Sequence, residues 1–289
     1  MPNMRIIHNN VADTATLTAL SNSVTYTVSG TPSLGYLQND FKSQAFRISK
    51  TYPVQFNLTW TANQTIGGVV LPCTNLSSSA RIRVILYNSG GTSIADTGAD
   101  GGNAAGKLAC PNTPLTNWTR STTAPDVNSF SLGGLSKVAV WFNTPVTGVQ
   151  KVQIDINDTS NLAANLDISR IVCGNYWEPG LNVDREGLQF NISDNTTNTR
   201  TDAGELISDQ GFVYDQLSFS LGLLAETDRN KLVEIIRSVG TSKNILVSVF
   251  PEGGTLQEQQ YLIYGKRDNS AIDYVIAGYY SHQLSILGW

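Results

Sequence analysis

The sequence has few of the residue types that catalytic sites and nucleic-acid-binding surfaces need. Only 15% of its 289 residues are charged, the net charge is −4, and no cluster of Lys and Arg is present. This excludes the basic surface that nucleic acids and anionic membranes bind. The two histidines, His8 and His282, lie far apart in motifs without triad or metal-site spacing, and His282 fits a strand pattern. We therefore expect no histidine-dependent catalysis and no metal centre.

Cysteines and long apolar runs are also scarce. Cys73, Cys110 and Cys173 show no CxxC or Cys/His spacing, which excludes a disulfide framework and a zinc site. Whether Cys73 and Cys110, each beside a proline, form a bridge stays open. No segment is long and apolar enough to span a membrane, and no apolar stretch follows the first residues. We expect neither membrane insertion nor a secretory signal.

Short strands separated by turn residues dominate the first part of the sequence. Apolar residues alternate with polar ones in residues 54–60, 82–86 and 152–156, the period of a half-buried strand. Residues 138–142 form a continuous apolar run, typical of a strand covered on both faces. Residues 88–117 are dense in Gly, Asp, Asn and Pro and predict a long loop. Residues 1–175 are therefore predicted to form a β-sandwich of the jelly-roll kind.

The second part predicts an α+β domain over residues 176–289. Thr227 is a suitable N-cap for a helix over about 227–239, and Gly240 supplies a C-terminal stop. The apolar stripe of this helix consists of Leu232, Ile235, Ile236 and Val239. Strands precede and follow it, including one with Leu217, Phe219, Leu221 and Leu223 expected on one face. We expect one helix on a largely antiparallel sheet.

Carboxylates offer the remaining route to catalysis. A glycosidase needs two of them at a defined separation across the bond it cleaves. Six acids cluster in the sequence: Glu178, Asp184, Glu186, Glu205, Asp209 and Asp215. The sequence sets no two of them at that separation, so solvated loop acids are the simpler interpretation. Residues 96–103 have oxygen ligands but lack the terminal Glu of a calcium loop. We expect neither an enzyme nor a cofactor.

One aromatic residue suggests contact with a sugar. Trp118 lies at the exit of the predicted loop, which also contains Asp100 and Asn103. Sugar-binding surfaces combine a flat ring with amide and carboxylate groups in this way. Trp60 and Trp141 lie within strand patterns and are predicted to be core residues. A carbohydrate-binding, or receptor-binding, module is therefore the alternative hypothesis, with Trp118, Asp100 and Asn103 as the possible glycan contacts.

Two segments carry a family resemblance that covers roughly residues 135–289. The first runs through the strand 152–158 and an Asn-rich turn to Ile168–Trp177, and the second joins Arg200–Glu205 to the strand Ser218–Leu221 and the helical segment Ala225–Gly240. This order resembles the minor tail and distal-tail-like proteins of long-tailed, siphovirus-type bacteriophages. Ala203 and Ser169 stand where that family often has glycine.

The resemblance implies a structural subunit of the tail tip or baseplate. It implies a discoidin-like jelly roll joined to a tail-tube-type β domain, assembling as a cyclic homo-oligomer around the tail axis with other tail proteins. Such a protein is made in the cytoplasm of the host bacterium and located in the virion. The resemblance suggests motif or interface residues at Arg170, Tyr176, Trp177, Arg200, Gly204, Glu205 and Asp209. The position in the ring, the stoichiometry and the host stay open.

Overall fold

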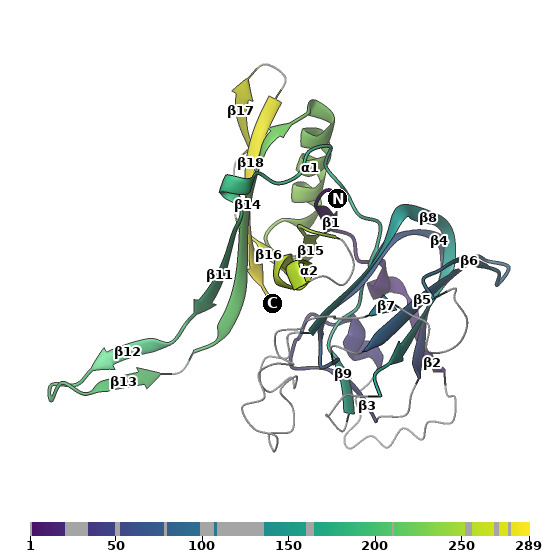
Figure 1. Ribbon diagram of the computed structural model, residues 1–289, viewed down its shortest axis with the longest axis horizontal. Helices are drawn as coiled ribbons and strands as arrows, with labels where there is room; N and C mark the ends of the chain where they lie inside the picture. Colours follow the sequence, from purple (N-terminus) through teal and green to yellow (C-terminus); the bar gives the residue numbers. More distant parts are fainter. Residues whose placement is uncertain are drawn as a thin grey trace. The chain divides into compact units, whose positions relative to one another are not determined.

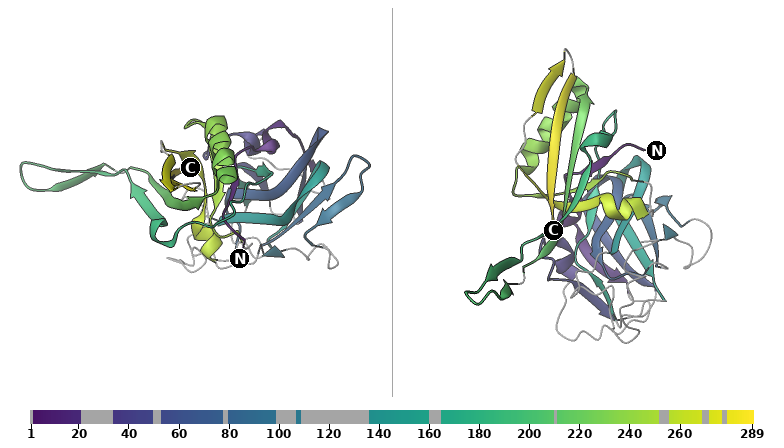
Figure 2. Two further views of the ribbon diagram at one scale, coloured as in Figure 1. Left: turned by 90° about the horizontal axis from the view of Figure 1, so that it is seen from above. Right: turned by 60° about the vertical axis from the view of Figure 1, so that its left-hand side comes forward.

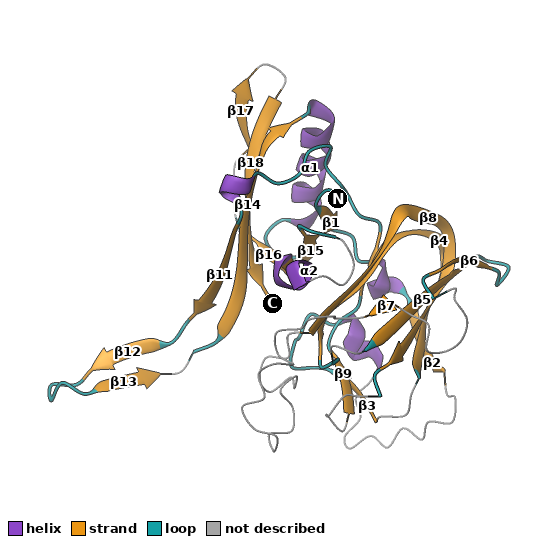
Figure 3. Cartoon of the chain, in the orientation of Figure 1, coloured by secondary structure: helices purple, strands orange, loops and turns teal. Residues whose placement is uncertain are grey.

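The computed structural model describes residues 2–20, 34–49, 53–77, 80–98, 107–108, 136–159, 165–209, 211–251, 256–268, 272–276 and 279–289. Most of these residues lie in strands (Figure 3), so the expected mainly β class is confirmed. Contacts divide the chain into two units, Met1–Glu178 with Ser248–Leu262 and Pro179–Val247 with Ile263–Trp289. The sequence set the boundary after residue 175 and assigned Ser248–Leu262 to the second domain, whereas this segment belongs to the first unit.

The first unit is a β-sandwich built around two long strands. Its elements are β1 (Arg5–Ile7), η1 (Val11–Thr14), β2 (Thr16–Leu20), η2 (Leu34–Gln38), β3 (Phe46–Ser49), β4 (Val54–Thr74), β5 (Arg81–Tyr87), β6 (Ser93–Asp96), β7 (Lys107–Leu108), β8 (Ser136–Asn157), β9 (Asn165–Ile168), β10 (Val172–Gly174) and α2 (Leu256–Tyr261). β4 and β8 pair antiparallel and bend together through both layers (Figure 1). The strands predicted over 138–142 and 152–156 are therefore two parts of β8, joined through irregular pairing with β4.

Each half of these long strands belongs to a different layer. The first half of β4 pairs with β2 and with the second half of β8, which also pairs with β5. The second half of β4 pairs with β10 and with the first half of β8. Side chains from both layers meet in one apolar core, to which Phe56 and Leu71 contribute with no exposed surface. Trp60 and Trp141, predicted as core residues, are 8% and 6% exposed.

The second unit is a sheet covered by one helix. Its elements are η5 (Arg185–Gly187), β11 (Gln189–Asp194), β12 (Thr197–Arg200), β13 (Leu206–Asp209), β14 (Val213–Leu224), α1 (Glu226–Val239), β15 (Asn244–Ser248), β16 (Leu262–Arg267), β17 (Ile272–Ile276) and β18 (Tyr279–Gly288). The strand order is β15-β16-β18-β14-β11, and β17 pairs with β18. α1 contacts β14 and β18, and it buries Leu232, Ile235 and Val239 of the predicted stripe.

The ends of the predicted helix were only partly correct. α1 begins at Glu226 after the N-cap residue Ala225, so Thr227 lies in the first turn instead of capping it. The carboxylate of Asp228 accepts a hydrogen bond of 2.9 Å from the backbone N–H of Gly180. The helix ends at Gly240 as predicted, with φ of 61°, a conformation that favours glycine.

Two further differences concern strands of the C-terminal part. Leu217, Phe219 and Leu221 are buried as predicted, but Leu223 is 52% exposed and Leu224 is buried instead. The pairing of β14 with β18 shifts register after Leu221, which turns the following residues to the other face. The sequence predicts a single helix in this part, but a second, short helix, α2, occupies Leu256–Tyr261 directly before β16.

Candidate functional site

A hairpin extends from the sheet of the second unit (Figure 1). β11 pairs with β14 from Gln189↔Ser218 to Asp194↔Val213, and β12 pairs with β13 from Thr197↔Asp209 to Arg200↔Leu206. We call β11, β12, β13 and the part of β14 paired with β11 the arm. Figure 2 shows the arm from two further sides. The charged residues of 200–209 predict a loop from the sequence; the turn covers only residues 201–205, whereas Arg200 ends β12 and Leu206–Asp209 form β13.

A tight turn closes the tip of the arm. Gly204 donates its backbone N–H to the carbonyl of Thr201 at 2.9 Å, and Glu205 donates its own to Thr201 Oγ1 at 3.1 Å. Arg200 Nη1 donates to the carbonyl of Gly204 at 3.0 Å. Gly204 has φ of 87°, which favours glycine. The turn therefore brings together Arg200, Gly204 and Glu205, three of the predicted interface residues, and Asp209 lies in β13 of the same hairpin.

The arm exposes apolar side chains. Eleven large hydrophobic residues are exposed in the described part of the chain; two, Phe41 and Ile94, belong to the first unit and the other nine to the second. Those in the arm and at its base are Ile192, Leu206, Ile207, Phe212 and Val213. Phe212 is 85% exposed, the highest value among them. An isolated two-stranded hairpin is only marginally stable in water, and clustered exposed apolar groups mark interaction surfaces.

One face of the arm continues the core-facing side of the sheet. Leu217 is fully buried beneath α1's side of the sheet and pairs with Phe190. Because alternate residues of a strand share a face, Ile192 and Val213 lie on this same side. These two side chains are 67% and 61% exposed. On this face Ile192 pairs with Asp215 and Val213 with Asp194, so exposed apolar side chains lie beside carboxylates past the end of the unit's own core.

Arg170, by contrast, lies in the interior of the sandwich. Two strands are separated at this residue, since β9 ends at Ile168 and β10 begins at Val172. Arg170 sits in this break with its side chain 2% exposed, and its Nη1 and Nε atoms lie 2.7 Å and 3.1 Å from carboxylate oxygens of Asp13 and Asp40. Burial raises the pKa of Asp13, and the hydrogen bond from Arg170 opposes this. The charged groups that contact Arg170 in this structure therefore belong to the sandwich itself.

Tyr176 and Trp177 fix the N-terminal strand to the sandwich. The backbones of Trp177 and Ile6 exchange hydrogen bonds of 2.9 Å and 2.8 Å, and Trp177 is 8% exposed. The hydroxyl of Tyr176 donates to the carbonyl of Asn143 at 2.9 Å, and the guanidinium of Arg5 lies 4.2 Å from its ring centre. Burial raises the pKa of Tyr176. These contacts are internal to the first unit.

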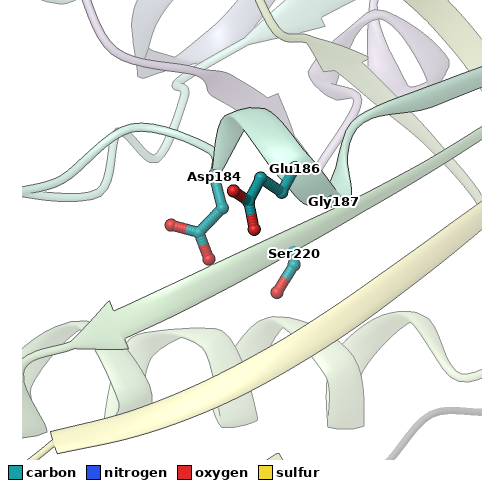
Figure 4. A pocket seen from close by; sticks show the side chains of 4 residues that line it. All are labelled: Asp184, Glu186, Gly187 and Ser220. Carbon is teal, nitrogen blue, oxygen red and sulfur yellow. The ribbon is translucent and has the colours of Figure 1, made fainter.

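The second unit has an open pocket of about 530 Å³ beside η5 (Figure 4). Asp184, Glu186 and Gly187 line it from one turn, and Ser220 lines it from β14. Asp184 also donates its backbone N–H to the carbonyl of Ser220 at 2.9 Å. Both carboxylates are exposed and come from the same turn, unlike the two acids that flank a glycosidic bond across a cleft. Among the described residues, no three His, Cys, Asp or Glu side chains group as metal ligands.

The remaining sequence predictions fall in different places. Trp118, Asp100, Asn103 and Cys110 lie outside the described residues. Asp96, the first residue of the segment considered for calcium, accepts a 2.9 Å hydrogen bond from Arg83 Nε, which lowers its pKa. His282 is buried in β18, and Cys173 is buried with a raised pKa. Among the described helices, none has the length and apolar character to cross a membrane.

Comparison with known proteins yields likeness in structure only. No family model and no curated protein matches the chain. The lectin domain of lectinolysin complexed with Lewis B antigen is 12% identical, with 57% of this chain and 95% of that one covered and a TM-score of 0.35. A fucose-binding module of Streptococcus pneumoniae is 12% identical, with 58% and 99% covered and a TM-score of 0.34. CpGH89CBM32-5 from Clostridium perfringens, in complex with GalNAc-β-1,3-galactose, is 10% identical, with 58% and 100% covered and a TM-score of 0.36. A likeness at this level assigns none of these ligands to this chain.

Proposed function

We propose that this chain is a non-enzymatic structural subunit of a bacteriophage tail tip or baseplate, assembling as a ring with copies of itself and with other tail proteins. The exposed apolar arm of the second unit carries the proposal. The phage origin, and with it a location in the virion, is supported by the resemblance of residues 135–289 to distal-tail-like proteins.

A projecting arm suits a ring for a geometric reason. A segment that docks on a different surface of the next copy makes a head-to-tail contact, and such contacts close into rings when the rotation between copies allows it. The body of the second unit has further exposed apolar residues that would complement the arm: Leu181, Leu223, Tyr279 and Leu287. Burying both sets in one contact removes the apolar surface that each copy exposes alone.

Shortening the arm tests the assembly. Asn195 donates its backbone N–H to the carbonyl of Phe212 at 3.1 Å, so residues 196–211 can be replaced by an Asn-Gly turn between paired positions. Light scattering after size-exclusion chromatography should show a closed oligomer for the full chain and a monomer for the shortened one. Circular dichroism should show that both are folded. A full chain that stays monomeric at high concentration would contradict the proposal.

The location is tested separately on particles. Mass spectrometry should detect the chain in purified phage particles, and antibodies against it should label one end of the tail in electron micrographs. Particles that infect normally and lack the chain would contradict this part of the proposal, whatever the recombinant protein does in solution.

A second candidate function is contact with a cell-surface glycan through the sandwich. It is favoured by a polar outer face on one layer of the sandwich, described below, and the sequence adds Trp118, Asp100 and Asn103 as possible contacts. A glycan array probed with the full chain tests it, and loss of binding in Trp118→Ala would assign the contact to the segment around that residue.

A further inference from the structure

One layer of the sandwich has a polar outer face. Val54, Phe56 and Leu58 of β4 point into the core, so the residues between them point outward. Antiparallel pairing sets Gln153 of β8 beside Asn57 and Asp155 beside Gln55, and β5 adds two further side chains at its pairs with β8. We define the polar face by six residues: Gln55, Asn57, Arg83, Tyr87, Gln153 and Asp155. The apolar Ile85, which is 6% exposed, pairs with Gln153 and lies between Arg83 and Tyr87 on the same side.

Hydrogen bonds hold the planar groups of this face in fixed positions. Gln153 donates from Nε2 to Asp155 Oδ1 at 2.9 Å, and its Oε1 accepts from the hydroxyl of Tyr87 at 3.2 Å. The Nζ atom of Lys151 lies 3.6 Å from the ring centre of Tyr87. A surface ordered in this way loses little conformational entropy when a ligand binds.

Two groups on the polar face are poorly solvated. Asn57 is 8% exposed, and its buried Oδ1 has no hydrogen-bond donor among the residues that the structure describes. Asp155 is 9% exposed, and burial raises the pKa of its carboxyl. A buried acceptor without a donor is a costly arrangement, and each such group in a folded protein calls for an explanation. A donor supplied by a bound molecule would satisfy it.

The charges of the polar face largely cancel. Arg83 pairs with Asp96, with Nε 2.9 Å from Oδ1, and Lys151 and Asp155 contribute one positive and one negative group. An anionic ligand would be repelled by the carboxylate of Asp155 and by the unpaired amide oxygen of Asn57. A cationic ligand would be repelled by the ammonium group of Lys151. Sugar hydroxyls both donate and accept hydrogen bonds. They can therefore pair with the amide and phenol groups of this face, and they can donate to its carboxylate.

We propose that the polar face binds a neutral oligosaccharide, with one ligand hydroxyl donating to Asn57 Oδ1. The inference rests on the second proposed function, glycan contact, and gives it a site on the sheet instead of the segment around Trp118. It does not depend on assembly through the arm.

The test compares matched variants of the full chain. The wild type is applied to an array of neutral and acidic oligosaccharides, and the neutral oligosaccharide giving the strongest signal is used for calorimetry. Thr18 is exposed on β2 directly opposite Asn57, so Thr18→Arg should block the face without disturbing the core. Thr241→Arg, the same change in an exposed turn after α1, is the control. We expect Thr18→Arg to weaken binding at least tenfold and Thr241→Arg and Trp118→Ala to leave it unchanged.

Two substitutions within the face refine the test. Asn57→Ala should weaken the same interaction about tenfold, and Asp155→Asn keeps the shape while changing the hydrogen bonding. Binding that survives Thr18→Arg and is lost in Trp118→Ala would overturn this inference while leaving glycan contact in place. Binding of acidic oligosaccharides alone would overturn the neutral-ligand assignment. If the wild type binds no oligosaccharide on the array, both the inference and the second proposed function fail.

Discussion

Replacing Ile192 and Val213 together by serine should weaken self-association of the chain without unfolding it. Both side chains lie on the arm face that continues the core-facing side of the sheet, and they are 67% and 61% exposed. Neither contributes to the unit's own core, so the monomer loses little beyond β-propensity, which spans about 1 kcal/mol. In the proposed ring, the contact would lose the apolar area that these two side chains bury against the next copy.

The magnitude follows from that exposure. Complete burial of an Ile or Val side chain is worth about 1.5–3 kcal/mol, and roughly two thirds of each is still available here, so each contributes about 1–2 kcal/mol to a contact. The pair contributes about 2–4 kcal/mol. Because about 1.4 kcal/mol corresponds to a tenfold change in Kd, the double variant should raise the Kd of one interface about 30-fold to 1,000-fold.

Sedimentation velocity over a concentration series measures this shift directly. The control is the double variant Phe41→Ser with Ile94→Ser, which removes the two exposed large hydrophobic residues described in the first unit, 64% and 39% exposed. The control should assemble like the wild type. An unchanged Kd for the arm variant, or an equal loss in the control, would refute the reasoning that the arm makes the contact.

Three further predictions concern particular contacts. Gly211→Ala should reduce hydrogen-exchange protection in β12 and β13 but not in α1, because a Cβ at this position would lie 2.3 Å from the backbone carbonyl carbon of Asn195. Unchanged protection would show that the arm accommodates the added methyl group. Trp141→Phe should lower the free energy of unfolding of the first unit by about 1–3 kcal/mol, measured by urea denaturation, since it removes the 2.6 Å hydrogen bond to the buried carboxylate of Glu258. A urea midpoint and a denaturation slope equal to those of the wild type would show that this hydrogen bond does not stabilise the unit. Asp96→Asn should make thermal stability less sensitive to acid: Arg83 lowers the pKa of Asp96, so their pair stabilises the fold fully above the unfolded pKa of about 3.9 and loses this as pH falls through the folded value. Melting temperatures measured from neutral pH to below that value should fall less steeply in the variant than in the wild type.

Patterns within a few residues of each other were predictable from the sequence. The apolar stripe of α1, its end at Gly240 and the alternation of β14 as far as Leu221 all follow from local periodicity. The register shift after Leu221 lies where a residue distant in the sequence approaches the strand. A Cβ at Gly222 would lie 2.2 Å from Asp184 Oδ2, and nothing in the local sequence reveals that approach.

The sequence missed the arm for a different reason. Strand patterns alternate when one face is buried, but the side chains of β12 and β13 are exposed on both faces. The segment therefore reads as a charged loop, with Asp202 and Glu205 in its turn. Burial of Arg170 was equally hidden, because its partner Asp13 lies 157 residues away in the sequence. Local composition marks an arginine as exposed, and only the tertiary fold sets two carboxylates around it.

The two segments that carry the family resemblance therefore have different physical meanings. Arg170 and Trp177 are internal to the first unit, where folding of the sandwich alone accounts for them. The fold of a single copy does not account for Ile207 and Phe212, which are 57% and 85% exposed, because polar residues at those positions would keep an isolated copy more soluble. Burial of these side chains against a partner would explain why apolar residues occupy these exposed positions. Function is thus better tested at the arm than at the buried motif residues, where any substitution reports first on stability.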